Sequence, residues 1–164
     1  MDTPQRIEPG PGQESAWDYP RPPRLERLDA RVQVWLDGTL IGDTTTPLRV
    51  LETYHPPTVY LPPDDVYTRS LVPLRRSSYC EWKGTASYFD VEAGPTRAER
   101  AAWAYFDPSP PFEALAGYVS FHPSRVDCTI DGERVVAQPS DFYGGWVTAR
   151  VTGPFKGSEG MDGW

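Results

Sequence analysis

The chain has 164 residues with 16 basic and 23 acidic side chains, which gives a formal net charge of −7. This length fits a single domain that buries a real hydrophobic core. The basic residues are scattered, whereas binding to a nucleic-acid backbone needs clustered Lys and Arg, so we expect no nucleic-acid partner.

The composition also excludes long helices and membrane spans. Nineteen prolines interrupt any helix longer than about three turns. No apolar stretch approaches the length that crosses a bilayer, and the N-terminus lacks the basic start and apolar run of a signal peptide. We therefore expect a soluble, cytoplasmic protein with no membrane partner. The sequence does not indicate its oligomeric state.

The first 28 residues form a proline-rich segment. Six prolines and two glycines fall in it, and it has too few apolar side chains to offset the entropy lost on ordering. Trp17 and Tyr19 are exceptions that could anchor the segment on the domain surface. We expect a mobile tail over residues 1–28 and a single β domain over residues 29–164.

Two aspartate-glycine pairs predict tight hairpin turns. Asp37-Gly38 separates two apolar stretches in RVQVWLDGTLIGDT, and Asp131-Gly132 does the same in VDCTIDGERVVAQ. Apolar and polar residues alternate before each turn, which is typical of strands with one buried face. Cys128 falls on the apolar side of the second hairpin, which favours a small buried side chain over a reactive one.

Further short strands are expected between and after these hairpins. They are rich in aromatic and β-branched residues, are separated by Gly and Pro, and lie at residues 48–52, 58–61, 85–91, 101–106, 117–122 and 146–151. One short helix is expected after Pro63, with Asp64 as its N-cap and Pro73 as its end. The pattern predicts a mainly β fold, either a small antiparallel barrel or a two-sheet domain.

The usual metal, cofactor and hydrolase motifs are absent from the sequence. The glycine-rich stretches DFYGGW and GPFKGSEG, the second of which contains Lys156, fit turns rather than phosphate loops. The sequence has no GxSxG motif, the motif that would indicate a serine hydrolase. The four soft metal-ligating side chains lack the paired spacing of structural zinc sites, so we expect no metal and no cofactor; they are His55, Cys80, His122 and Cys128.

The stretch YCEWKG carries the two candidate catalytic residues, Cys80 and Lys83. Cys80 could act as a nucleophile if His55 or His122 lies beside it in space, but a lone cysteine among aromatic residues is more often buried and inert. Lys83 is either an anchor for an anion or an ordinary surface lysine at a strand end. Glu52, at the end of the strand LRVLE, is the candidate partner of Lys83.

Five blocks of the sequence match one bacterial family in order. They read LETYHPPTVYLPPDDV, YCEWKGTASYFDV, AAWAYFDPSP, GYVSFHPSRVD and DFYGGWVTARVTGPFKG. The match as a whole covers about residues 31–157. In these blocks the chain resembles domain of unknown function 427, a family that is also labelled nucleotidyltransferase-like. The sequence lacks the Gly-Ser motif and the paired acidic metal ligands of nucleotidyltransferases, so the label implies little about mechanism.

The resemblance implies a compact, mostly β domain, of the β-tent kind in which two antiparallel sheets lean together. Proteins of that wider fold often hold zinc through two CxxC pairs, which this sequence lacks. Glu81 replaces the proline of the Cys-Pro-x-Lys-Gly motif that is frequent in the family. The matched positions are Glu52, Tyr60, Pro62, Asp65, Val66, Cys80, Lys83, Gly84, Tyr88, Trp103, Tyr105, Tyr118, Phe121, Asp141, Tyr143, Gly144 and Trp146.

The sequence is compatible with three kinds of function. The first is binding of a small molecule in an aromatic-lined pocket that includes Trp82. The second is an enzyme that uses Cys80, Lys83 or Glu52 on a nucleotide-like or acyl substrate. The third is a protein-interaction module. We favour the first, with a ligand-binding set made of Glu52, Tyr60, Lys83, Tyr88, Trp103, Tyr105 and Tyr118.

Overall fold

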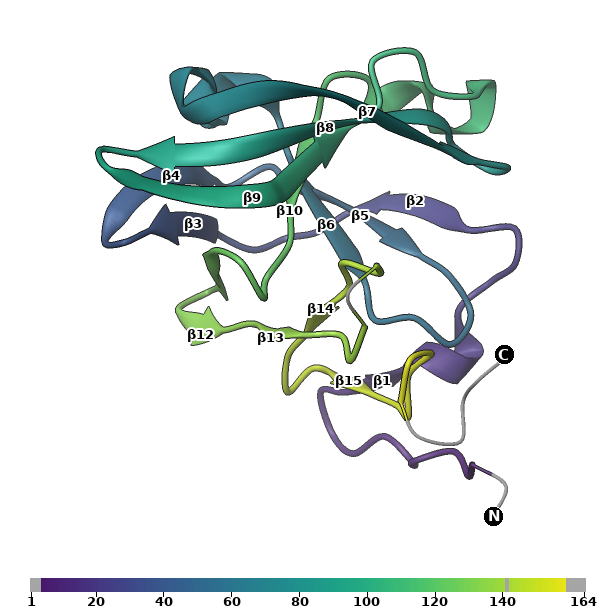
Figure 1. The fold of residues 1–164 in the computed structure, drawn as a ribbon. Helices are drawn as coiled ribbons and strands as arrows, with labels where there is room; N and C mark the ends of the chain where they lie inside the picture. Colours follow the sequence, from purple (N-terminus) through teal and green to yellow (C-terminus); the bar gives the residue numbers. More distant parts are fainter. Residues whose placement is uncertain (1–3, 141, 159–164) are drawn as a thin grey trace.

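The chain is mainly β and is built around a seven-stranded sheet and a smaller four-stranded sheet. Figure 1 shows the arrangement of the strands. This computed structural model describes residues 4–140 and 142–158, so Asp141, one of the matched family positions, lies outside the described residues. Both large sheets are antiparallel, and within the described ranges neither closes into a barrel. The predicted mainly β fold is confirmed in its two-sheet form.

The strands of the two sheets interleave along the chain. The seven-stranded sheet contains, in spatial order, β2 (Arg24–Arg27), β5 (Leu48–Leu51), β6 (Thr58–Leu61), β10 (Val119–Phe121), β9 (Thr96–Ala104), β8 (Gly84–Ala93) and β7 (Leu71–Cys80). The four-stranded sheet contains β12 (Glu133–Arg134), β11 (Asp127–Ile130), β3 (Val32–Leu36) and β4 (Thr39–Thr44). Two short pairs complete the fold: the parallel β1 (Glu14–Ser15) with β15 (Val151–Thr152), and the antiparallel β13 (Val136–Ala137) with β14 (Trp146–Val147).

Both predicted hairpin turns are confirmed. Asp37 and Gly38 join β3 to β4 with φ angles of 50° and 77°, and Asp131 and Gly132 join β11 to β12 with φ angles of 49° and 82°. Positive φ at both central residues is the turn geometry whose twist matches that of the flanking strands. Cys128 lies in β11 and is buried, as its position on the apolar side predicts.

The short helix expected after Pro63 is present only as a single 3-10 turn, Pro63–Asp65, with Pro62 at the N-cap position instead of the expected Asp64. A second 3-10 turn follows at Thr68–Ser70, and β7 then begins at Leu71, where the prediction still had helix. β7 is an edge strand, which explains how it accommodates Pro73, because a proline at a sheet edge need not cost a ladder hydrogen bond. The other 3-10 helices of the described residues are Ala16–Asp18 and Pro110–Leu115.

The seven-stranded sheet buries residues on both of its faces. Val59 of β6 and Ala102 of β9 belong to the main core, which they share with residues of the four-stranded sheet. Tyr60 and Trp103, one position further along the same strands, belong to a second, aromatic cluster. Successive side chains of a strand point to opposite faces, so the second cluster covers the face turned away from the main core. This face carries the cavity described below.

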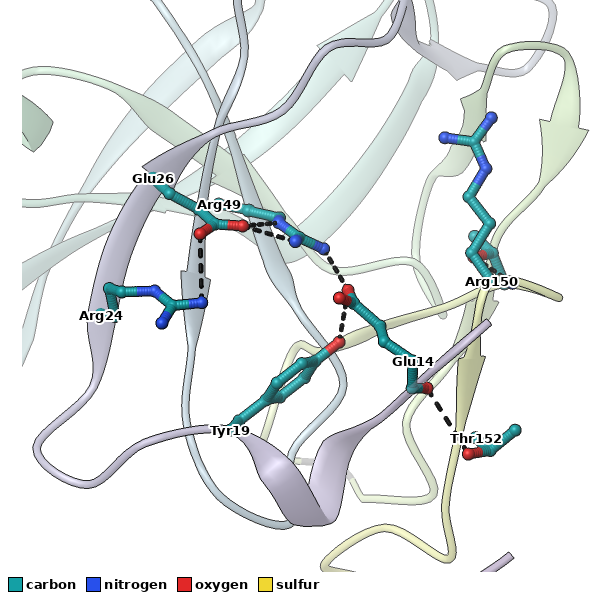
Figure 2. Close-up of polar contacts among 8 residues, drawn as sticks. Glu14, Tyr19, Arg24, Glu26, Arg49, Arg150 and Thr152 are labelled. Carbon is teal, nitrogen blue, oxygen red and sulfur yellow. Dashed lines mark hydrogen bonds and ion pairs between the residues drawn. The ribbon is translucent and has the colours of Figure 1, made fainter. Parts of the chain in front are cut away.

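The N-terminal segment packs against the rest of the fold, in contrast to the mobile tail that its composition predicts. β1 pairs with β15, β2 pairs with β5, and Ala16 and Tyr19 are buried. Figure 2 shows Arg49 between Glu14 and Glu26. The nearest nitrogen–oxygen distance to each carboxylate is 2.5 Å. Tyr19 donates a hydrogen bond to Glu14 at 2.9 Å. Strand pairing uses backbone groups, so a proline-rich segment with two buried anchors can be held without many apolar residues.

Candidate functional site

A cavity of about 530 Å³ lies against the aromatic face of the seven-stranded sheet. Its walls come from β5, β6 and the segment between them, from strands β7 to β9 with the turn that joins β7 to β8, from the segment after β10, and from the C-terminal segment 138–156. A cavity of this size can hold a small organic molecule. Tyr118 of the expected ligand-binding set does not line it and packs elsewhere in the aromatic cluster, whereas the other six do: Glu52, Tyr60, Lys83, Tyr88, Trp103 and Tyr105.

Hydrogen bonds fix the aromatic rings of the cavity wall. Tyr60 is completely buried, and Trp103 donates its Nε1–H to the Tyr60 hydroxyl at 3.2 Å. The Tyr88 hydroxyl lies 2.6 Å from the Ser78 hydroxyl on the neighbouring strand. Gly144 of the C-terminal segment approaches Trp103 so closely that a Cβ at that position would lie 2.2 Å from the ring. The rings therefore form a preformed wall whose position depends on the C-terminal segment.

Every lysine and every histidine of the chain lines this cavity. Only two of the 16 basic residues are lysines, Lys83 and Lys156, and the two histidines are His55 and His122. Three arginines bring the cationic side chains of the lining to five, against two carboxylates. A strongly acidic protein thus contains a cavity with a positive lining; the remaining charged residues are Arg76, Arg100, Arg125, Glu52 and Glu81.

Lys83 is half-buried in the turn between β7 and β8. Its carbonyl accepts a hydrogen bond from the Ser109 N–H at 3.0 Å, and its ammonium lies 5.4 Å from the centre of the Tyr105 ring. Burial lowers the pKa of Lys83, but interactions with Tyr60, Cys80 and Glu52 outweigh burial and raise it above the usual value. Lys83 is therefore a charged group at neutral pH, suited to holding an anion and not to acting as a neutral amine nucleophile.

Lys156 approaches the cavity from the C-terminal segment. Its ammonium lies 5.2 Å from the centre of the Tyr143 ring, in the same kind of contact that Lys83 makes with Tyr105. The backbone of Lys156 is held on both sides, since its N–H donates to the Tyr54 carbonyl at 2.8 Å and its carbonyl accepts from Gln138 Nε2 at 2.7 Å. Two ammonium groups on aromatic rings thus stand in two different walls of the cavity.

His55 lies between these charges and is neutral. Burial, Lys156 and Lys83 lower its pKa from the usual 6.5 to about 4, although its hydrogen bond with Gln138 opposes the shift. Gln138 Nε2 lies 3.2 Å from His55 Nδ1, so that nitrogen accepts and Nε2 carries the proton. Nε2 faces the Glu52 carboxylate at 3.9 Å. His55 is therefore neutral across the whole neutral range, with its Nε2–H directed toward Glu52 in the cavity lining.

Arg76 lies in β7, and the other basic residues of the lining lie on the side of the cavity formed by β9 and the segment after β10. His122 Nδ1 lies 2.7 Å from the Ser124 hydroxyl, and the His122 ring contacts Trp103 edge-on at 6.5 Å between centres. Arg125 donates to the carbonyl of Arg100 at 2.9 Å, which fixes the two arginines relative to each other. These contacts place a second group of cationic and donor side chains beside the aromatic wall.

Cys80 lines the cavity as a half-buried side chain at the end of β7. The hydrogen-bond partner of His55 is Gln138, and that of His122 Nδ1 is Ser124, so neither of these contacts joins a histidine to the thiol. Cys128 lies in the main core, where burial raises the pKa of its thiol. Among the residues that the structure describes, no three His, Cys, Asp or Glu side chains lie close enough together to hold a metal ion.

Sequence reasoning missed the convergence of His55, His122, Lys156 and Gln138 on the expected pocket. It treated the histidines as isolated metal-ligand candidates or as a possible base beside Cys80, and Lys156 as part of a glycine-rich turn. A signal was present in the composition, because lysine and histidine are both rare in this chain and all four copies line one cavity. The glycine-rich stretch is a close-approach element, as Gly144 and Gly145 leave room for Trp103 and for Pro56.

The family model described as domain of unknown function 427 matches residues 24–132. This match spans more than half of the chain. The chain belongs to this family. The short label of the family refers to NTP transfer, which agrees with the expected nucleotidyltransferase-like name. A search of curated proteins found no match. The matched range ends before the C-terminal segment, which supplies the cavity wall with Gln138, Tyr143 and Lys156.

The described part of the chain contains no candidate membrane-spanning helix. None of its helices has both the length and the hydrophobicity to cross a bilayer.

Proposed function

We propose that this protein binds a small organic anion with a planar ring in the 530 Å³ cavity. The observation that carries the proposal is the charge of the lining, which has five Lys and Arg side chains against two Glu, a surplus of three positive charges (5 − 2 = 3) in a chain of net charge −7. Clefts lined by one sign of charge concentrate ligands of the opposite sign.

The polar groups of the cavity suit an anionic headgroup. Lys83 and Lys156 supply two ammonium groups, and His55 supplies a neutral N–H donor between them. Carboxylate and phosphate oxygens accept charge-assisted hydrogen bonds from such donors, which are stronger than bonds between neutral groups. We infer that the headgroup lies among these three side chains.

The aromatic groups suit the planar part of the ligand. Trp103 and Tyr88 provide ring surface on the cavity wall. Tyr79 and Phe142 also line the cavity but are 77% and 70% exposed, so they stand where it opens to solvent. Rings of this kind bind flat ligands through stacking and burial of apolar area. The exposed pair would cover the outer part of a bound ring.

The enzyme alternative is less well supported. A Lys83 nucleophile needs a neutral amine, whereas the pKa of Lys83 is raised by Tyr60, Cys80 and Glu52 against the lowering effect of burial. A Cys80 nucleophile needs a neighbouring base, and the described hydrogen bonds of the two histidines go to Gln138 and Ser124. Binding requires neither condition.

The presence of only two lysines makes the proposal directly testable. Reductive methylation with ¹³C-formaldehyde keeps each ammonium charged and labels Lys83, Lys156 and the terminal amine. We would titrate the labelled protein with benzoate, adenosine 5′-monophosphate and inorganic phosphate, and with neutral benzamide as a control. Saturable movement of both lysine signals with a ring-bearing anion, and none with benzamide, is the expected result.

Two variants separate site binding from a general charge effect. Lys83→Met and Lys156→Met each remove one ammonium from the lining, while Arg69→Met removes one positive charge outside it. The proposal requires weaker binding in the first two and unchanged binding in the third. Equal weakening in all three, or lysine signals that do not respond to any of the anions, would refute it.

A further inference from the structure

Two separate segments bring polar groups to the cavity, and both are attached to one short N-terminal stretch. The first segment, residues 52–55, carries Glu52 and His55, and the second, residues 151–156, carries Lys156. The N-terminal stretch is residues 14–20, which we call the strap. None of the strap residues lines the cavity.

The strap holds the first segment through backbone hydrogen bonds on either side of Trp17. The N–H of Tyr54 donates to the Ala16 carbonyl at 3.0 Å. The Thr53 hydroxyl donates to the Tyr19 carbonyl at 2.6 Å, and the Thr53 N–H reaches the carbonyl of Pro20 at 3.3 Å. These three bonds fall on the two residues directly before His55, so they determine where its ring enters the cavity.

The strap holds the second segment through Trp17 and β1. The Trp17 Nε1–H donates to the Pro154 carbonyl at 2.8 Å, and β1 pairs in parallel with β15. The Trp17 ring also contacts Tyr54 edge-on at 5.4 Å, so the same side chain touches both segments. The segments meet directly where the Lys156 N–H donates to the Tyr54 carbonyl at 2.8 Å.

The strap is itself anchored in the body of the protein. Ser15, Ala16 and Tyr19 are buried, and Figure 2 shows Glu14 joined to Arg49 and to the Tyr19 hydroxyl. A strap that were free to move could not fix the segments it touches. Arg49 lies in β5, so the strap is anchored on the seven-stranded sheet.

We propose that Trp17 is a positioning residue, which sets the positions of His55 and Lys156 by tying their two segments together. The strap lies outside residues 24–132, so the complete site is a property of this longer chain and not of the region that the family model matches. The proposal concerns the cavity of the proposed function but holds whether or not that ligand assignment is correct, because its test needs no ligand.

A positioning role for Trp17 matters because a polar binding site tolerates only small displacements of its donor groups. Donors that bind an anion must lie within about 0.5 Å of their productive positions, which requires support from surrounding side chains. Releasing the segment that carries His55 would also admit water to the ring. Desolvation is the largest cause of the depressed pKa of His55, so hydration moves that pKa back toward its usual value.

The test uses the full chain with two substitutions at one position. Trp17→Phe keeps a ring against Tyr54 but removes the hydrogen bond to Pro154, and Trp17→Ala removes both contacts. Cys128→Ala, in the main core, is the control for a general loss of stability. His55 is titrated by proton NMR through its ring signals, which a His122→Gln variant assigns. Amide exchange of Lys156 is measured on the same samples.

The expected results are graded. Trp17→Phe should raise the pKa of His55 by about half a unit, and Trp17→Ala by about one unit or more, with faster exchange of the Lys156 amide in the same order. Cys128→Ala should lower the melting temperature and leave both site measurements unchanged. The proposal is overturned if the His55 titration in both Trp17 variants stays at its wild-type position, or if Cys128→Ala moves it equally.

Discussion

The N-terminal ion-pair network of Glu14, Glu26 and Arg49 differs from the cavity in what surrounds its positive charge. In the network, the Arg49 side chain is only 17% exposed and lies between Glu14 and Glu26. Burial lowers the pKa of Arg49, but the hydrogen bonds to these two carboxylates outweigh it and raise the pKa. In the cavity, neither Lys83 nor Lys156 makes an ion pair with a carboxylate of the described residues.

This difference distinguishes a structural cation from one that is available for binding. A cation enclosed by carboxylates has its charge satisfied within the fold, and removing it leaves two acidic groups uncompensated. Cations that gather around a cavity without such partners repel one another and are stabilised when an anion enters. The two regions therefore differ in whether their cations are paired with carboxylates, and not in how many cations they contain.

Removing the N-terminal strands should destabilise the protein more than any single substitution. A chain that begins at Asp29 lacks β1, β2 and the buried Ala16 and Tyr19. We expect its free energy of unfolding to fall by more than about 3 kcal/mol, because a buried ring and two strand pairings are lost. Urea denaturation of both chains measures this change. Equal midpoints for the two chains would instead restore the view of a dispensable tail.

The burial of His55 beside the cavity should make the free energy of unfolding depend on pH. The folded-state pKa of His55 is about 4, below its usual 6.5, so between these values the unfolded chain binds a proton that the folded chain does not. Stability from His55 is therefore fully present above pH 6.5 and is lost as the pH falls to about 4, by up to about 3 kcal/mol.

His55→Gln isolates this contribution. The variant should have a flatter dependence of the unfolding free energy on pH between 6.5 and 4, as measured by urea denaturation at each pH. Asp90 provides an internal reference, because its pKa lies below 3.8 and its contribution is lost only in more acidic solution. An unchanged slope in His55→Gln would mean that the ring is not buried as a neutral group.

The sequence predicted the part of this molecule that depends on local pattern. The Asp-Gly turns need positive φ at fixed positions, and the alternation along β6 and β9 places Tyr60 and Trp103 on one face of the sheet. The sequence marked Trp17 and Tyr19 as possible anchors of the strap but favoured a mobile tail, because most of its attachments are backbone hydrogen bonds, which leave no mark on composition. His55 and Lys156 are 101 positions apart, and only the closed fold brings them to one cavity.

A single substitution should disrupt the ion-pair network around Arg49. Arg49→Met removes the cation between Glu14 and Glu26, and we expect a loss of about 2 kcal/mol in the free energy of unfolding, since the two half-buried carboxylates then repel each other. Adding Glu14→Gln should restore part of that loss, because it removes the repulsion. A thermal or urea denaturation series over the three proteins measures both steps, and a double variant less stable than Arg49→Met would contradict this account.

Lys83→Met should change the stability of the fold less than any of the substitutions above. Methionine keeps most of the volume of lysine and removes a charge that has no ion-paired carboxylate, so the free energy of unfolding should change by less than about 1 kcal/mol. Binding of a ring-bearing anion such as benzoate should nevertheless weaken by at least about tenfold, because one charge-assisted hydrogen bond contributes about 1.4 kcal/mol or more. Calorimetric titration and urea denaturation of the same variant measure the two quantities. If Lys83→Met destabilises the fold as strongly as Arg49→Met, then Lys83 is a structural cation and the distinction between the two regions fails.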